Sequence, residues 1–560
     1  MKQSIKNITT LAFLTLPALV FGQNTGIGDQ EITITKEKQV QLKKANRVFE
    51  KIQVEKNTTE DKKMSYEFFE KKPNGIEQTD FKPTVVSPVD TKKNRNDQTT
   101  GYKNYVKAGV GNYGRLFAET YINSDQDEDL VYSIYGLHNG TSRGPIEGQN
   151  SAINIDNIVL SGKYHASNFE LKSDVGFESR NYRFFGYDTL NYELTKTDLK
   201  QRLNMFNFGV GFENTNPKPI VDFGVNTRLR TLNDFYDAEE IDWASAAHAY
   251  FPIIEKHVTA MVNAESYITQ RSDNYFDNPV RKRNLFRVEP SFNIDYSQFN
   301  VKVGFKAVNE YDQIKGINLT KGFPTATVTY KTRDLLYFFA GYDGDIIRNT
   351  LRSMLDENPW LMPQVDLENT TKNQEIYIGS RAELFKGFGY NFKASYGKFS
   401  NLYFFNTFEG DPKTRMFKIE YDPNLTDFVN IATELKYEPI EIWRTNLKFN
   451  YWYYETINFE HPYHRPSFEG RLGNTFVVSD KIVSNIDFYY IGSRYARDPF
   501  IVEDIKLKGI ADLNAEFTYL FSNQFSAFVK LNNILGQNYQ RYLNYPQMGL
   551  NFLVGLNVSL

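Results

Sequence analysis

The sequence contains no cysteine among its 560 residues. Disulfide bonds, thiolate metal sites and a cysteine nucleophile are therefore excluded. Attachment of a lipid to a cysteine near the N-terminus is excluded as well. Apart from its first residues, the chain has no apolar run that approaches the ~20 residues of a membrane-spanning helix, which excludes a helical membrane protein. The net charge of −3 and the pI near 6.2 give no basic excess that would favour nucleic-acid binding.

Catalytic and metal-binding patterns are also scarce. No glycine-rich phosphate loop is present, and serine, histidine and aspartate residues cannot be assembled into a triad from their spacing. The segment HPYH, 461–464, would need further ligands to hold a metal ion. The segment SDQDED, 124–129, has the spacing of calcium ligands but lacks the central glycine of an EF-hand loop. We predict an aromatic loop and a solvated turn at these positions, and a protein that is not an enzyme and binds no cofactor or metal.

Aromatic residues are abundant, although the chain as a whole is polar. Phenylalanine occurs 45 times and tyrosine 37 times, while the mean hydropathy is −0.52. A transmembrane β-barrel combines these properties, because only alternate residues of each strand face lipid while the lumen side is wet.

Strict alternation of apolar and polar residues recurs from residue 102 to the end of the chain. The clearest examples are FELKSDVGFESR (169–180), FNVKVGFKAVNE (299–310), WRTNLKFNYWYYE (443–455) and MGLNFLVGLNVSL (548–560). A strand with charges on one face and apolar groups on the other separates water from lipid. The charges predicted to line the lumen include Glu170, Lys172, Asp174, Arg228, Arg230, Lys302, Lys306, Arg444 and Lys448.

The breaks between these strands alternate between short and long, which is the asymmetry of bacterial barrels with short periplasmic turns. Pattern alone gives twenty-three strands, but a single-chain barrel with both termini in the periplasm needs an even number. The conflict falls between residues 400 and 430. Either residues 401–422 form an extended hairpin outside the membrane, or residues 416–421 join the following strand through a bulge. Both solutions predict an all-β fold, a closed antiparallel transmembrane barrel of about 22 strands.

The region before the barrel is of a different kind. Residues 1–22 have the basic start and apolar core of a signal peptide, so we expect export. Residues 23–101 are rich in mixed charges and poor in apolar residues, and such a segment cannot bury a core of its own. We expect it to be largely extended or disordered, either in the periplasm or threading the lumen, and we assign residues 102–560 to the barrel.

The last hundred residues resemble the closing strands of TonB-dependent outer-membrane receptors. The segments that carry the resemblance are HRPSFEGRLGNTF (464–476), FYYIGSRYA (488–496), residues 507–542 and YPQMGLNFLVGLNVSL (545–560). The resemblance implies a 22-stranded barrel in the outer membrane of a Gram-negative bacterium. The chain departs from the family in two ways: Leu560 replaces the usual terminal aromatic residue, and residues 23–101 are too few and too polar for the plug domain. We therefore expect a plug-less member.

Two further segments are candidate contact sites. EITIT, comprising Glu31, Ile32, Thr33, Ile34 and Thr35, is similar to the short box that such receptors offer to TonB by strand addition. The longest outer loop, 345–372, carries the apolar residues Met354, Leu355, Trp360, Leu361 and Met362. So many apolar groups should pack against something: the barrel interior as a lid, a neighbouring loop, or a partner protein. We favour packing among loops.

Two functions remain open from the sequence. We predict that the barrel passes a ligand across the outer membrane; the alternative is a non-transporting subunit that forms a platform in an outer-membrane protein complex. The expected partners are outer-membrane lipid and either TonB or other outer-membrane and periplasmic proteins, without nucleic acid. The missing plug weakens energised uptake and strengthens the platform hypothesis. The sequence does not identify a substrate, a partner protein or an oligomeric state.

Overall fold

A computed structural model describes residues 104–559, except for 125–128, 147, 188–191, 217–218, 255–256, 273–279, 333–335, 386, 411–414, 441, 500 and 502. The signal peptide, the charged N-terminal segment and the EITIT segment predicted above lie outside the described residues. In the part of the chain that is described, no helix has the length and apolar character needed to cross a membrane.

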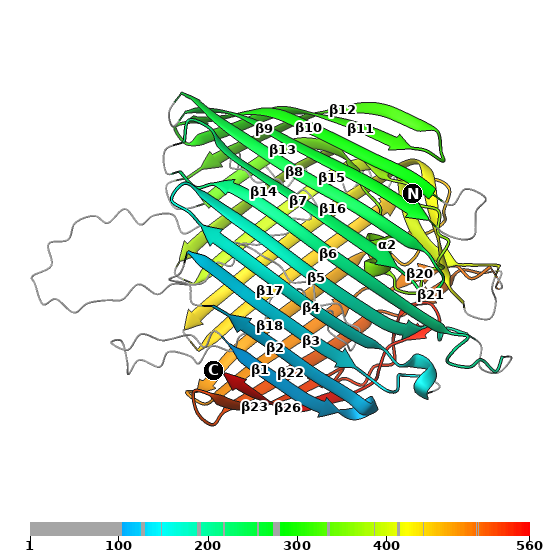
Figure 1. Cartoon of the computed structure of the whole chain (residues 1–560). Helices are drawn as coiled ribbons and strands as arrows, with labels where there is room; N and C mark the ends of the chain where they lie inside the picture. Colours follow the sequence, from blue (N-terminus) through cyan, green and yellow to red (C-terminus); the bar gives the residue numbers. More distant parts are fainter. Residues whose placement is uncertain are drawn as a thin grey trace, which may run out of the picture.

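Twenty-two antiparallel strands form a single closed sheet, as the sequence predicts (Figure 1). They are β1 (Tyr105–Gly111), β2 (Arg115–Asn123), β3 (Leu130–Gly140), β4 (Asn154–His165), β5 (Phe169–Arg183), β6 (Lys200–Asn214), β7 (Asp222–Asn233), β8 (Glu239–Ile254), β9 (Val258–Ser272), β10 (Val280–Tyr296), β11 (Phe299–Asp312), β12 (Ile317–Lys331), β13 (Leu336–Ile347), β14 (Thr370–Phe385), β15 (Phe388–Thr407), β16 (Phe417–Ile440), β17 (Trp443–Glu455), β18 (Phe468–Ser479), β19 (Ile482–Ile491), β22 (Ile510–Leu520), β23 (Phe525–Asn532) and β26 (Asn551–Ser559). Pairing of β1 with β26 closes the sheet.

Small elements lie between these strands. Two short hairpins pair β20 (Arg494–Ala496) with β21 (Ile505–Leu507), and β24 (Gln540–Tyr542) with β25 (Tyr545–Pro546). Two 3-10 turns, η1 (Asn112–Gly114) and η2 (Gly148–Ser151), and one α-helix, α2 (Leu351–Glu357), complete the described elements.

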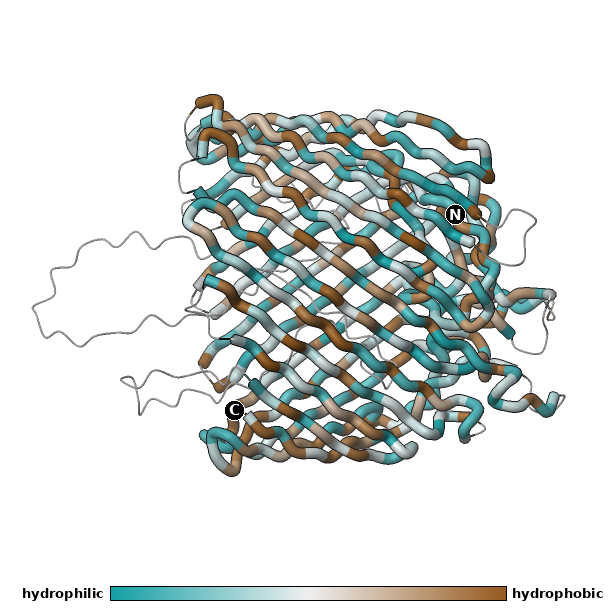
Figure 2. Tube along the Cα trace, in the orientation of Figure 1, coloured by the Kyte–Doolittle hydropathy of each residue, from teal (hydrophilic) through white to brown (hydrophobic). Residues whose placement is uncertain are grey.

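The two faces of the sheet differ as the alternation predicts. In the last strand, Phe552, Val554 and Leu556 are exposed on the outer surface, whereas Leu553 is fully buried. The same period appears along the strands as hydrophobic segments interleaved with hydrophilic ones (Figure 2). Phe169, Phe212 and Phe223 stack on neighbouring strands near one end, with centroid separations of 5.5 and 5.8 Å. An apolar outer band with an aromatic girdle is the architecture of an outer-membrane barrel.

Short and long connections occupy opposite ends of the barrel. The short turns, such as 166–168 and 297–298, share one end with the start of β1 and with the C-terminus. The long connections, such as 348–369 and 533–550, lie at the other end, where Figure 1 also places α2. By the rule for bacterial barrels, the end with long connections faces the cell exterior. We call it the outer end.

The region that complicates the strand count is a continuation of β15 and β16. These strands are 20 and 24 residues long, and their pairing runs on from Leu402 with Asp422 to Thr407 with Phe417. The register shifts between Ser400 and Leu402, where Asn401 adopts a φ of 59°. Residues 401–422 therefore form an extended hairpin beyond the barrel rim, joined to the membrane strands through a bulge. The two alternative solutions describe one structure.

Candidate functional site

At the outer end of the barrel, its own connections pack together into an apolar core. We call this core the cap. It gathers side chains from seven places along the chain: Tyr182, Phe184, Phe185, Leu203, Met205, Leu232, Ala238, Leu351, Met354, Leu355, Trp360, Leu361, Met362, Val365, Leu367, Phe405, Phe417, Ile419, Ala496, Leu507, Tyr542, Leu543 and Tyr545. A cluster of this size at the mouth of a barrel excludes water in the way that a domain core does.

The centre of the cap is the connection between β13 and β14, of which residues 350–368 are here called the lid. The lid begins with α2, whose N-cap Thr350 forms a reciprocal capping box with Ser353. The helix turns Leu351, Met354 and Leu355 into the cap. The five apolar residues of this loop singled out in the sequence, Met354, Leu355, Trp360, Leu361 and Met362, are all buried there, packed against other connections of the same chain.

Trp360 makes the most extensive aromatic contacts of the lid. Its ring stacks on Tyr545 at 4.3 Å and meets Phe185 and Tyr542 edge to face at 5.7 and 6.0 Å. The backbone on either side of Leu361 pairs with Phe417 of the extended hairpin, through Phe417 N to Trp360 O and Met362 N to Phe417 O, both 2.9 Å. The lid is thus held by the hairpin through main-chain bonds as well as by packing.

The polar side of the lid is bonded to the inner wall of the barrel. Glu240 of β8 accepts the main-chain N–H groups of Leu351 and Arg352, at 2.7 and 3.1 Å. Arg180 of β5 pairs with Asp356 of α2 at 2.6 Å. Further along the lid, Arg271 of β9 donates to the carbonyl oxygens of residues 363 and 365. These bonds satisfy polar groups that would otherwise be buried alone.

The two ends of the lid are bonded to each other. Asn349 donates its side-chain N–H to the carbonyl of Glu368 at 2.8 Å, and its backbone N–H to the side chain of Asn369 at 3.2 Å. Arg283 of β10 donates to both ends, reaching the Asn349 carbonyl at 2.8 Å and the Asn369 amide oxygen at 2.7 Å. We call this set of bonds the staple. The staple therefore holds the two ends of this long loop side by side, while its apolar side chains pack against other connections.

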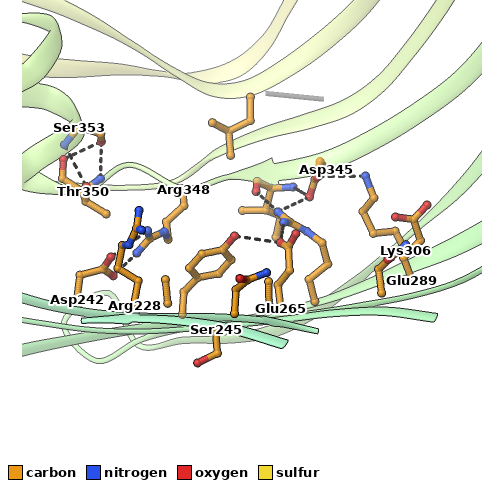
Figure 3. Close-up of a pocket in the computed structure, with 18 of the residues that line it drawn as sticks. Arg228, Asp242, Ser245, Glu265, Glu289, Lys306, Asp345, Arg348, Thr350 and Ser353 are labelled. Carbon is orange, nitrogen blue, oxygen red and sulfur yellow. Dashed lines mark hydrogen bonds and ion pairs between the residues drawn. The ribbon is translucent and has the colours of Figure 1, made fainter. Parts of the chain in front are cut away.

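A cavity of about 1100 Å³ remains beneath the lid. Eleven lysine and arginine side chains and ten carboxylates are among the residues that line it. Many of them form ion pairs within the wall, most of them between different strands: Asp174 with Arg228, Lys306 with Asp343 and Asp345, Lys372 with Asp343 and Glu375, Lys393 with Glu375, and Arg287 with Glu265 and Asp345. Figure 3 shows this lining, with Arg348 directed toward Asp242 and Lys306 toward Asp345.

Most of the charges predicted to line the lumen lie in this cavity. Its lining includes Lys172, Asp174, Arg228, Arg230, Lys302, Lys306 and Lys448. Glu170 sits nearer the periplasmic end of β5 and pairs with Lys163, His165 and Lys172. Arg444 does not line the cavity. It is the second residue of β17, beside a short turn, and its exposed side chain faces Glu438 at 3.5 Å. Arg444 has the same parity in β17 as Lys448, which lines the cavity, but it lies nearer the periplasmic end, because alternation gives the facing direction of a residue and not its depth.

The wall residues that hold the lid were not identified from the sequence. Glu240 and Asp242 alternate with the exposed residues Ile241 and Trp243, so the two-residue period that identified Arg228 and Arg230 was available for them too. Their bonds to residues 348–352 span more than a hundred positions of sequence. No local pattern indicates such a contact.

The two histidines of HPYH, His461 and His464, contact other groups of the same chain. His464 is buried and uses both ring nitrogens: Nδ1 lies 2.7 Å from the carbonyl of Phe405, and Nε2 accepts the N–H of Leu543 at 3.2 Å. Burial lowers the pKa of His464 to about 3, so the ring is neutral. His461 stacks on Tyr495 at 3.6 Å. Across the described residues, no three histidine, aspartate or glutamate side chains are grouped closely enough to hold a metal ion.

One pentapeptide, GTSRG at 140–144, has the spacing of the nucleophile elbow of hydrolases. That elbow requires a turn between a strand and a helix, so that the serine is presented at the head of the helix. Here Ser142 follows β3 into an outer turn, and its hydroxyl donates to the carbonyl of Tyr113 at 3.4 Å. The segment does not form a nucleophile elbow.

No family model matches the sequence, and no curated protein matches it either. Solved structures do match. A mutant of the ferric enterobactin receptor PfeA from Pseudomonas aeruginosa has a TM-score of 0.60 at 12% identity, covering 82% of this chain and 80% of the receptor. The siderophore receptor PirA from Acinetobacter baumannii gives 0.61 at 11%, with 82% and 80% covered. The iron transporter FrpB from Neisseria meningitidis gives 0.65 at 8%, with 81% of each chain covered.

These similarities show that the chain has the barrel fold of siderophore receptors. They agree with the resemblance of its C-terminal segments to TonB-dependent receptors. At identities of 8–12%, the comparison establishes the fold alone.

Proposed function

We propose that this protein is a receptor-like barrel of the Gram-negative outer membrane that is sealed at rest and acts as a structural subunit of an outer-membrane protein complex. The observation that carries the proposal is the closure of the outer mouth by the cap. An open pore needs a continuous wet path, and here the lid and the extended hairpin occupy that path with buried apolar side chains.

The number of lid side chains that are buried in the cap supports a stable closure. Eight lid side chains are buried: Leu351, Met354, Leu355, Trp360, Leu361, Met362, Val365 and Leu367. Burying one large apolar side chain contributes roughly 1.5–3 kcal/mol. The eight together contribute a burial term on the order of 10 kcal/mol or more, which offsets part of the entropy cost of ordering the loop.

Single-channel recording tests the closure. Residues 23–560 in a planar bilayer should give no steady conductance. In a matched variant, residues 350–368 are replaced by a short glycine–serine linker, which the adjacent ends at Asn349 and Asn369 allow. Conductance in the variant alone would place the barrier at the lid, whereas steady conductance of the unaltered chain would contradict a sealed barrel.

A second measurement tests the structural role. We expect the tagged chain, extracted from outer membranes in a mild detergent, to migrate on native gels with other membrane proteins at a fixed stoichiometry. Recovery as a free monomer from the same extracts, under conditions that preserve a known outer-membrane complex, would contradict the proposal.

Passage of a ligand is the second candidate, and the cavity beneath the lid favours it. The matched structures are described as receptors for ferric enterobactin or siderophores and as an iron transporter. A cavity of about 1100 Å³ is slightly larger than the usual range of small-molecule sites. Uptake of a labelled ferric siderophore that depends on this protein would support passage. In that case, the TonB contact predicted at Glu31–Thr35 becomes testable by deletion.

A further inference from the structure

The bonds at the ends of the lid are separate from those along its body. The staple joins the ends of the lid to each other and to Arg283, at the top of β10. The body of the lid is bonded to the extended hairpin and to the wall, and the wall bonds, here called the docking bonds, include those to Arg180, Glu240 and Arg271 on three other strands. Breaking the docking bonds therefore leaves the ends of the lid held together.

The lid also has hydrogen bonds within itself, in addition to those it forms with the wall. The capping box between Thr350 and Ser353 fixes the first turn of α2, and Asn358 N donates to Met354 O at 2.8 Å to close the helix. The side chain of Asn358 then accepts the N–H of Trp360 at 3.1 Å. A loop with joined ends, a capped helix and its own turn is able to move without losing these bonds.

We propose that the lid is a preassembled gate, which leaves the wall as one unit by turning about the staple and so opens the cavity to the cell exterior. This inference rests on the closure described under the proposed function and is independent of the structural role. Hinged closure around a cavity is a known class of conformational change, in which a few residues at the ends of an element absorb the movement.

Thiol labelling measures this movement directly, because the chain has no cysteine of its own. Ala246 of β8 lines the cavity and has a small side chain, so Ala246→Cys adds a single thiol beneath the lid. On whole cells, a polar maleimide of about 2 kDa is too large to pass general porins and reaches this thiol only through the outer mouth. The variant with the lid replaced by a linker, carrying the same Ala246→Cys change, gives the labelling rate of the open state.

The test variant removes two wall contacts of the lid, through Arg180→Met and Arg271→Met together in the Ala246→Cys background. The matched control makes the same change at Arg228 and Arg287, two cavity arginines whose ion pairs are with the carboxylates Asp174, Glu265 and Asp345, all on barrel strands. We expect labelling of the introduced thiol to rise at least tenfold in the test variant and less than threefold in the control. A parallel digestion with an added protease should leave residues 350–368 uncut in both.

The outcomes separate this inference from the closure itself. If the test variant is labelled no faster than the control, these contacts do not hold a gate, and the inference is overturned. If labelling rises only together with cleavage inside 350–368, the lid unfolds rather than turning as a unit, which overturns it as well. If the Ala246→Cys thiol is labelled at the open-state rate while the lid is unaltered, the barrel is not sealed at rest. That result would contradict the proposed closure, whatever the movement of the lid.

Discussion

Replacing Trp360 by alanine should loosen the cap without weakening the barrel. The indole is buried against Phe185, Tyr542 and Tyr545, with ring separations of 4.3 to 6.0 Å. None of these contacts belongs to the strand pairing that closes the 22-stranded sheet. The free energy lost should therefore appear in the docking of the lid rather than in the unfolding of the barrel.

The magnitude follows from the truncation of a buried aromatic ring. Trp→Ala substitutions in cores cost about 3–5 kcal/mol, and the three aromatic contacts place Trp360 within this range rather than below it. A loss of about 4 kcal/mol corresponds to roughly a thousandfold increase in the undocked fraction. When closing is faster than labelling, the labelling rate is proportional to that fraction.

The assay is maleimide labelling of the Ala246→Cys thiol on cells, normalised to the variant that lacks the lid. Trp243→Ala is the matched control, because that indole is exposed on the outer surface of β8. We expect labelling in Trp360→Ala to rise about a thousandfold, with the thermal unfolding temperature of the barrel close to that of the control. Equal labelling rates in the two variants would refute the assignment of Trp360 to the closure, as would a fall in barrel unfolding temperature without faster labelling.

Two further predictions concern acid and the barrel seam. The pKa of His464 is lowered to about 3 from an unfolded value near 6.5, so the neutral ring stabilises the cap fully above pH 6.5. This stabilisation falls by about 1.4 kcal/mol per pH unit as the pH drops toward 3, and normalised labelling should therefore rise in acid. The His464→Asn variant should lose this pH dependence, and the His461→Asn variant should keep it. At the seam, a Cβ on Gly555 would lie 2.1 Å from the carbonyl oxygen of Ala108, whereas one on Gly162 would meet only Ser173 Oγ at 3.6 Å. Gly555→Ala should therefore cost about 1–3 kcal/mol and lower the temperature at which the barrel loses its folded gel migration, while an equal loss in Gly162→Ala would contradict the seam contact.

The alternation of apolar and polar residues and the requirement for an even number of strands were sufficient to predict the barrel, because each strand obeys a local rule. A residue faces lipid or lumen according to its position in a two-residue period, and this places Phe552 outside and Lys306 inside without knowledge of any partner. The even number of strands follows from both termini lying at one end. The two-residue period does not encode depth along the barrel axis, so it could not tell that Arg444 lies beside a short turn while Lys448 lines the cavity.

The cap could be expected only in outline, because its contacts join distant segments. The apolar residues of the lid indicated that the loop packs against something, yet nothing near Trp360 in sequence points to Tyr545 or Phe417. Similarly, Arg180 and Asp356 pair across 176 positions. Such pairings are settled by where the closed sheet brings the outer connections together, and that geometry appears only once all the strands are paired.

The pairing of charges in the cavity bears on the choice between the two functions. A site built to draw in a charged ligand presents an excess of one sign, because the summed field raises the local ligand concentration. Here Lys306 lies about 3 Å from both Asp343 and Asp345, and Lys372 bridges Asp343 and Glu375. These carboxylates already compensate the nearby cations, so a ligand would have to displace existing ion pairs and bear the cost of leaving a partner unpaired. The lining is thus better suited to bracing nearby strands of the wall, such as β11, β13 and β14, than to recruiting an ion from outside, which favours the proposed structural role.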